Sequence, residues 1–244
     1  MEIIFQFSNE QFNAVITSLP FPKKSEVINK KLSQTVDKKE AFVDEIFWFD
    51  DFVKVHNWTL VCLDMLRQIR FGLAYAICYY DFKLSPLIQP EQFINSNDRF
   101  VFYYFIDNCV YRISTVLDRV GQLFNELSGL GLEEKEVSFS CVVDLLNKDE
   151  KIQHANLVKR INRRINGSRW TNIKELKEYR NSFTHRMEPK FQGYTSETKD
   201  GVTTFFNKKN PYDITTLKTL VLESYKMVVE IIELVIDEAY KVSR

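Results

Sequence analysis

Hydrophobic and polar positions repeat along most of this chain with the period of an α-helix. Apolar residues are dense from about 38 to 80, where Gly72 is the only glycine or proline, so the pattern predicts one very long helix or two in line. A second long helix is predicted from about 91 to 127, ended by Gly129 and Gly131. Its apolar residues recur every three to four positions, which is typical of a buried helix face: Phe102, Ile106, Val110, Ile113, Leu117, Val120 and Phe124.

The remaining periodic segments are shorter, apart from the last. Further helices are predicted at 134–147, 150–165, 171–187 and 214–242. The helix at 171–187 stops before Pro189, because the residue before a proline is biased away from helical geometry.

A different pattern separates the last two predicted helices. Residues 191–209 alternate apolar and polar side chains around Lys199-Asp200-Gly201. An Asp-Gly pair between such flanks is a hairpin signal. We expect a two-stranded hairpin or an ordered loop there.

Composition supports an all-α fold. The 244 residues include only 7 Gly and 6 Pro, and 45% are hydrophobic, which favours long helices around a sizeable core. The expected architecture is an up-and-down helical bundle with a small hairpin or loop insertion before the last helix. We interpret residues 1–36 as an N-terminal segment packed on the bundle, and 37–244 as the helical domain with an insertion at 189–212.

Charge and cysteine usage narrow the class of protein. The 33 Lys and Arg balance the 33 Asp and Glu, so any contact with nucleic acid must come from a local patch. The four cysteines show no Cys-x-x-Cys spacing and are read as buried thiols in a reducing compartment: Cys62, Cys78, Cys109 and Cys141. The N-terminus lacks a basic signal-peptide start and no apolar run reaches about 20 residues, so we expect a cytoplasmic protein with no membrane contact.

The candidate chemistry lies in the predicted helix at 171–187. Only three histidines occur, and only His185 has an arginine, Arg180, four to six residues before it. A histidine can move a proton on or off a ribose oxygen, and an arginine can hold the charge that builds on phosphorus. The bare pair is weak evidence, because roughly 0.4 such pairs are expected by chance in a chain of this composition. The alternative is a structural one, with Arg180 beside the core and His185 exposed near a helix C-terminus.

Helical geometry places this pair on a polar arc. The apolar face of the helix is expected to consist of Ile173, Leu176, Tyr179, Phe183 and Met187. The adjoining arc of roughly 140° carries Lys177, Arg180, Asn181, Thr184 and His185.

Two further features are candidates for supporting roles. Arg160, Arg163 and Arg164 share a helical face that suits phosphate contact; the alternative is a solvated face with acidic partners. Asp107 lies in a very apolar helix and therefore needs a partner. Arg180 is one candidate partner for Asp107, and a structural hydrogen bond elsewhere is the other.

The stretch EYRNSFTHRM at 178–187, in an all-helical chain and just before its last long helix, resembles the motif of the HEPN superfamily. The matching positions are Arg180, the polar Asn181 and His185. The resemblance implies a metal-independent endoribonuclease in which two protomers form one composite site. His185 would act as acid or base, Arg180 would stabilise the phosphorane, and Asn181 would orient the histidine or the phosphate. The products would be a 2′,3′-cyclic phosphate and a 5′-hydroxyl.

The resemblance also suggests partners and alternatives. The implied substrate is RNA, and the implied assembly is a homodimer. If the protein is a toxin or defence effector, an antitoxin protein is a further candidate partner. HEPN toxins that are neutralised by AMP attachment carry a tyrosine two residues after the histidine; Met187 here argues against that form of control. A non-catalytic HEPN module that binds a nucleotide, RNA or a protein is the second reading, and a purely structural helical protein is the third. No cofactor is implied, and no convincing metal cluster is visible.

Overall fold

The computed structural model describes eight segments of the chain, and each predicted helix lies at least partly within one of them. These segments are residues 7–22, 46–84, 96–148, 155–164, 167–185, 194–199, 202–207 and 213–239.

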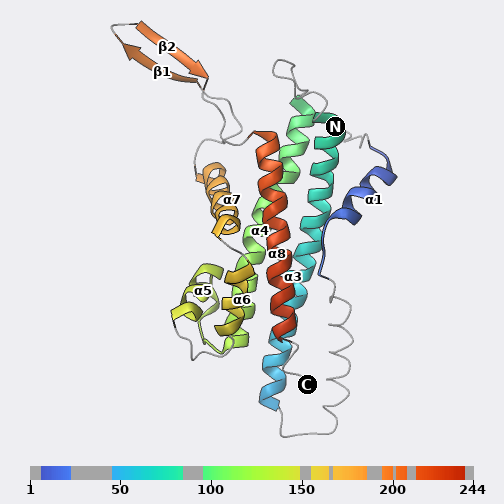
Figure 1. The fold of residues 1–244 in the computed structure, drawn as a ribbon, viewed down its shortest axis with the longest axis vertical. Helices are drawn as coiled ribbons and strands as arrows, with labels where there is room; N and C mark the ends of the chain where they lie inside the picture. The colour runs from blue at the N-terminus through green and yellow to red at the C-terminus, as the bar shows by residue number, and fades with distance from the viewer. Residues whose placement is uncertain are drawn as a thin grey trace.

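Three long helices form the centre of the bundle. They are α3 (Ile46–Tyr79), α4 (Ser96–Ser128) and α8 (Ile214–Ala239), which lie side by side along the long axis of the molecule (Figure 1). All seven residues of the predicted stripe on α4 are at most 1% exposed, which confirms the predicted face. A π-helical turn, η2 (Tyr80–Leu84), extends α3. The predicted starts of the first two long helices, at 38–45 and 91–95, lie outside the described residues.

Shorter helices pack along one side of this centre. They are α5 (Phe139–Lys148), α6 (Ala155–Arg164) and α7 (Gly167–His185) (Figure 1). Helix α5 contacts α4, α6 contacts α8, and α7 contacts both α4 and α8. The fold is therefore the helical bundle that the sequence predicts.

Two predicted helix starts are wrong. Helix α7 begins at Gly167, four residues before the predicted start at 171, and α5 begins later than predicted. The helix expected at 134–147 begins only at Phe139, after a single 3-10 turn, η4 (Glu134–Glu136). Ser138 explains the difference, because its Oγ accepts a hydrogen bond from the backbone N–H of Cys141 at 3.2 Å and caps α5. Upstream, the backbone of Leu132 is held by both ends of the Asn125 side chain, so the segment follows α4 instead of forming a helix.

The described part of the N-terminal segment lies against α3. Helix α1 (Asn9–Ser18) starts with a capping box formed by Ser8 and Gln11. The Phe12 ring packs on Tyr75 of α3 with centroids 4.5 Å apart, and Arg70 Nε donates to the carbonyl of Ile16 at 3.0 Å. These contacts attach α1 to α3 beside α4, because the Tyr75 ring also stacks on Phe105 of α4 with centroids 4.9 Å apart.

The predicted hairpin is present between α7 and α8. Strands β1 (Tyr194–Lys199) and β2 (Val202–Asn207) pair antiparallel. Lys199 pairs with Val202, so the register leaves two residues, the predicted Asp200 and Gly201, between the strands. The hairpin stands away from the helices (Figure 1). Among the described residues, no helix has both the length and the apolar character needed to cross a bilayer.

Candidate functional site

Helix α7 is fixed to the bundle by the first three residues of the predicted apolar face; the Phe183 side chain and Met187 lie outside the described residues. Ile173, Leu176 and Tyr179 are all buried. Tyr179 Oη also donates a hydrogen bond of 2.8 Å to Asp107 Oδ1 on α4. This bond supplies the partner that the Asp107 carboxylate requires in its apolar helix. It also fixes the position of the residue directly before Arg180.

The Arg180 side chain is held in place by its neighbour. Its Nε and Nη2 both donate to Asn181 Oδ1, at 3.3 and 3.1 Å. Two bonds from a planar guanidinium to one acceptor fix the orientation of the plane. Arg180 is half-buried and Asn181 is exposed, so the pair lies where the bundle surface meets solvent. Asn181 was expected to orient the histidine or the phosphate; here its amide oxygen orients the arginine.

His185 is the last residue of α7, and its side chain lies outside the described part of the structure. The backbone from Arg180 to His185 is helical throughout. Five residues of α-helix correspond to about 140° of rotation and about 7.5 Å of rise. Along the backbone of one α7, residues 180 and 185 are therefore separated both around and along the helix axis.

The three candidate phosphate-binding arginines of α6, Arg160, Arg163 and Arg164, differ in what the structure describes of them. Arg160 Nη1 lies 3.0 Å from Glu238 Oε2 on α8, so this arginine ties the two helices together. For Arg160, this contact agrees with the alternative interpretation, in which the arginines of this helix face have acidic partners. Arg163 is exposed, and the side chain of Arg164 lies outside the described residues. Phosphate contact by Arg163 and Arg164 stays a prediction.

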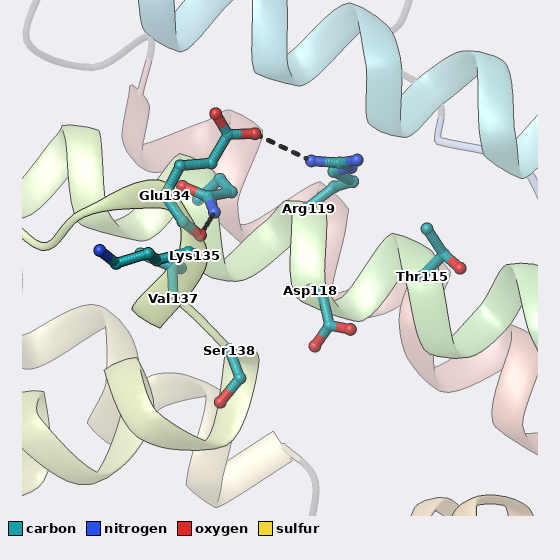
Figure 2. A pocket seen from close by; sticks show the side chains of 8 residues that line it. Thr115, Asp118, Arg119, Glu134, Lys135, Val137 and Ser138 are labelled. Carbon is teal, nitrogen blue, oxygen red and sulfur yellow. Dashed lines mark hydrogen bonds and ion pairs between the residues drawn. The ribbon is translucent and has the colours of Figure 1, made fainter.

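Two surface grooves lie near α5. The first, of about 530 Å³, is bounded by α4 and residues 134–138 (Figure 2). Arg119 and Glu134 reach toward each other in it, with Nη1 and Oε1 3.5 Å apart. Gln122 Nε2 donates to the Glu134 carbonyl at 2.8 Å. Three of the polar residues of this first groove, Arg119, Gln122 and Glu134, thus contact one another.

The second groove, of about 420 Å³, lies between α5 and α7 and was not predicted. Its lining is mostly apolar and contains Phe139, Ser140, Val143, Asp144, Asn147, Trp170, Ile173, Lys174 and Lys177. Four of these residues belong to α7, the helix that carries Arg180. The sequence did not indicate this groove, because Trp170 precedes the predicted helix at 171–187 and joins the face of Lys177 only in the longer helix α7. The groove also depends on the approach of α5.

The cysteines behave as buried apolar groups rather than as reactive ones. Cys62, Cys78 and Cys109 are buried as predicted, whereas Cys141 is only partly buried. Burial raises the pKa of Cys62 and of Cys109 to about 12, so both thiols are protonated and weakly nucleophilic near neutral pH. Within the described residues, no group of three His, Cys, Asp or Glu side chains is placed to hold a metal ion.

Comparison with known families adds the last observation. The family model described as Cthe2314-like HEPN matches residues 58–240, from α3 to the end of α8. We found no significant match among curated proteins or among solved structures. The matched region contains α7 with Arg180, Asn181 and His185, and the family points to a nuclease or RNA-related role. From this match over most of its length, the chain belongs to the HEPN superfamily.

Proposed function

We propose that this protein is a metal-independent endoribonuclease with a site built from Arg180 and His185. The observation that carries the proposal is the arrangement on α7. Tyr179 anchors the helix to Asp107, and Asn181 orients the Arg180 guanidinium at the surface of a HEPN chain. A pre-oriented cation beside a proton-transfer group is what cleavage of a phosphodiester by its own ribose requires.

The proposed reaction needs no group from outside the chain and the RNA. A histidine takes the proton of the ribose 2′-hydroxyl, and the 2′-oxygen attacks the neighbouring phosphorus. The bond from phosphorus to the 5′-oxygen breaks, and that oxygen receives a proton from an imidazolium. Arg180 donates to the phosphoryl oxygens, on which negative charge increases in the transition state. The products are a 2′,3′-cyclic phosphate and a 5′-hydroxyl.

A dimer supplies both proton-transfer groups. One histidine cannot be base and acid in the same step, and on one α7 the positions of Arg180 and His185 are about 140° apart. Two α7 helices related by a two-fold axis would bring two arginines and two histidines to one cleft. Light scattering should therefore give about twice 28.9 kDa, and a monomer at micromolar concentration would remove the shared cleft.

The test is cleavage of single-stranded RNA by the purified full chain and by two variants. His185→Ala should lower the cleavage rate about 10²–10⁴-fold. Arg180→Ala should lower it at least as much. His154→Ala is the matched control and should cut at the rate of the unmodified chain. Activity should persist in EDTA, and a 2′-deoxy substitution at the cleaved nucleotide should block it. Equal cutting by His185→Ala would place the site elsewhere.

The same variants test a role as a toxin or defence effector that an antitoxin protein opposes. Expression of the unmodified chain should arrest bacterial growth, and expression of His185→Ala should not. If the purified chain binds RNA but cuts none, the non-catalytic HEPN module replaces the nuclease.

A further inference from the structure

The α7 residues that line the second groove, from Trp170 to Lys177, precede Arg180 on the same helix. Positions seven residues apart on a helix differ by only about 20°, so Arg180 follows Ile173 and Lys177 follows Trp170 along nearly the same lines. Lys177 precedes Arg180 by three residues, or about 4.5 Å of rise. The groove wall on α7 and the proposed reaction site thus form one continuous strip, with the groove on the N-terminal side.

The groove combines an aromatic wall with charges of both signs. Trp170 is only partly buried, and its ring packs on Phe139 with centroids 5.8 Å apart. Val143 and Ile173 complete the apolar lining, and exposed Asp144 borders it from α5.

Two lysines stand on the α7 side of this wall. Lys174 is exposed and Lys177 is half-buried. Within the described ranges, neither ammonium group has a carboxylate within ion-pair distance, in contrast with Lys135 beside the first groove, which pairs with Glu133 at 2.7 Å. An anion is therefore the natural complement of this rim.

We infer that the second groove binds an unpaired nucleobase of the RNA, an inference that rests on the proposed function. The base stacks on Trp170, which offers a flat apolar face that any base can use. Asp144 accepts a hydrogen bond from an amino group on the edge of the base, and Lys174 and Lys177 contact the flanking phosphates. The groove volume of about 420 Å³ lies within the range of small-molecule sites, roughly 300–1,000 Å³.

The charges favour a nucleotide over an apolar peptide side chain. A peptide anchor would fill the apolar wall but leave two ammonium groups beside it without anions. A nucleotide presents a flat ring, an edge of hydrogen-bond donors and a phosphate on each side, which matches the wall, Asp144 and the lysines in turn. The carboxylate further favours adenine, cytosine and guanine, which carry amino groups, over uracil.

Binding of single-stranded ten-residue oligonucleotides with 2′-O-methyl riboses tests this inference without cleavage, because the attacking hydroxyl is blocked. Fluorescence anisotropy of labelled oligo(A), oligo(C) and oligo(U) gives the dissociation constants for the full chain. Trp170→Leu should weaken binding of all three about 5- to 100-fold, and Trp170→Phe should retain most of the affinity. Asp144→Asn should reduce the preference for oligo(A) and oligo(C) over oligo(U) about five- to tenfold.

Matched variants in the first groove provide the controls. Asp118→Asn and Lys135→Ala should leave all three dissociation constants unchanged. Asp144 is exposed and Asn is isosteric, so Asp144→Asn decides the matter even if Trp170→Leu fails to fold. If the unmodified chain cuts RNA but neither substitution alters binding, the groove inference is overturned while the nuclease stands. If the unmodified chain binds no RNA, both are overturned.

Discussion

The two grooves near α5 share a boundary but differ in how their charged side chains are paired. Ser138 lines the first and Phe139, the next residue, lines the second. The first contains four charged side chains, and its arginine and glutamate bind each other (Figure 2). The second is mainly apolar, and its lysines have no carboxylate partner within the described residues.

This difference shows that a high density of charged residues does not by itself mark a binding site. Arg119 both pairs with Glu134 and lies 5.2 Å from the centroid of the Trp58 ring, so it joins η4 and α3 to α4. The charged pair in the first groove therefore has a structural role, because it connects three elements of the fold. The second has an aromatic wall, and the lysines on its rim have no carboxylate partner among the described residues; both lysines precede Arg180 on α7.

The largest expected contrast is between two half-exposed arginines. Arg180→Ala should lower single-turnover RNA cleavage at least 10²-fold, the usual loss when one stabilising donor to a transition state is removed. Arg119→Ala should leave cleavage unchanged and lower the free energy of unfolding by about 1 kcal/mol, since it loses a surface ion pair and a cation–π contact. A large loss of cleavage in Arg119→Ala would move the reaction toward the first groove.

The next effect concerns Gly121, which lies under the boundary between the grooves. A Cβ atom there would meet the backbone nitrogen of Phe139 at 2.9 Å, so Gly121→Ala must push the start of α5 away from α4. We expect a loss of about 1–3 kcal/mol in urea unfolding.

Gly72→Ala is the control for this substitution. Its Cβ would meet only the Sγ of Cys109, at 3.2 Å, and alanine is the better helix former, so its effect should be much smaller. Equal stability of the two variants would mean that α5 follows α4 without strain. The Gly121→Ala variant should also bind RNA more weakly, because the second groove is built on Phe139.

Much of the fold could be predicted because it depends on local periodicity. The buried stripe of α4 and the hairpin register at Lys199 and Val202 follow from apolar spacing and from one Asp-Gly pair. The start of α5 could not be predicted, because the segment before Phe139 is held by Asn125 and Gln122 of another helix.

The candidate site could be predicted only in part, for a similar reason. The motif identified Arg180, and the need for a partner identified Asp107. The alternative of a structural hydrogen bond to Asp107 describes the bond that Tyr179 donates, but the sequence did not identify Tyr179 as its donor. Tyr179 had been assigned to the apolar face, where its ring is indeed buried. Arg160 was selected by its helical face, yet its contact with Glu238 depends on how α6 approaches α8. Such pairings between helices are set by tertiary packing, which periodicity within one helix does not encode.

A moderate effect of pH on stability is expected from Cys62, whose thiol interacts with the charge of Arg119. Burial raises the pKa of Cys62 from 9.0 to about 12, an effect that the nearby Arg119 charge opposes. The folded thiol therefore stays protonated while the unfolded thiol ionises. Its contribution to stability is complete below pH 9 and is lost as pH rises from 9 toward 12. At pH 10, one unit above the unfolded value, the loss is on the order of 1 kcal/mol. Between pH 8 and pH 10, the free energy of unfolding should fall less in Cys62→Ala than in the unmodified chain, and the difference should equal that loss. Equal losses in the two proteins would contradict a raised pKa for Cys62.

The smallest effect should come from the ion pair that fills the first groove. The Glu134 side chain is 71% exposed and that of Arg119 is 37% exposed, so solvent and salt screen their attraction. A double-mutant cycle with Glu134→Gln and Arg119→Met should give a coupling of about 0–1 kcal/mol in urea unfolding, and less in 0.5 M salt. The Gln122 bond to the Glu134 carbonyl is retained in both variants, so η4 should keep its position. RNA binding should not change, because the second groove contains neither residue. The exposure of the two side chains indicates that the first groove is open to water. A coupling above about 2 kcal/mol would contradict this, because it would show that the pair is desolvated.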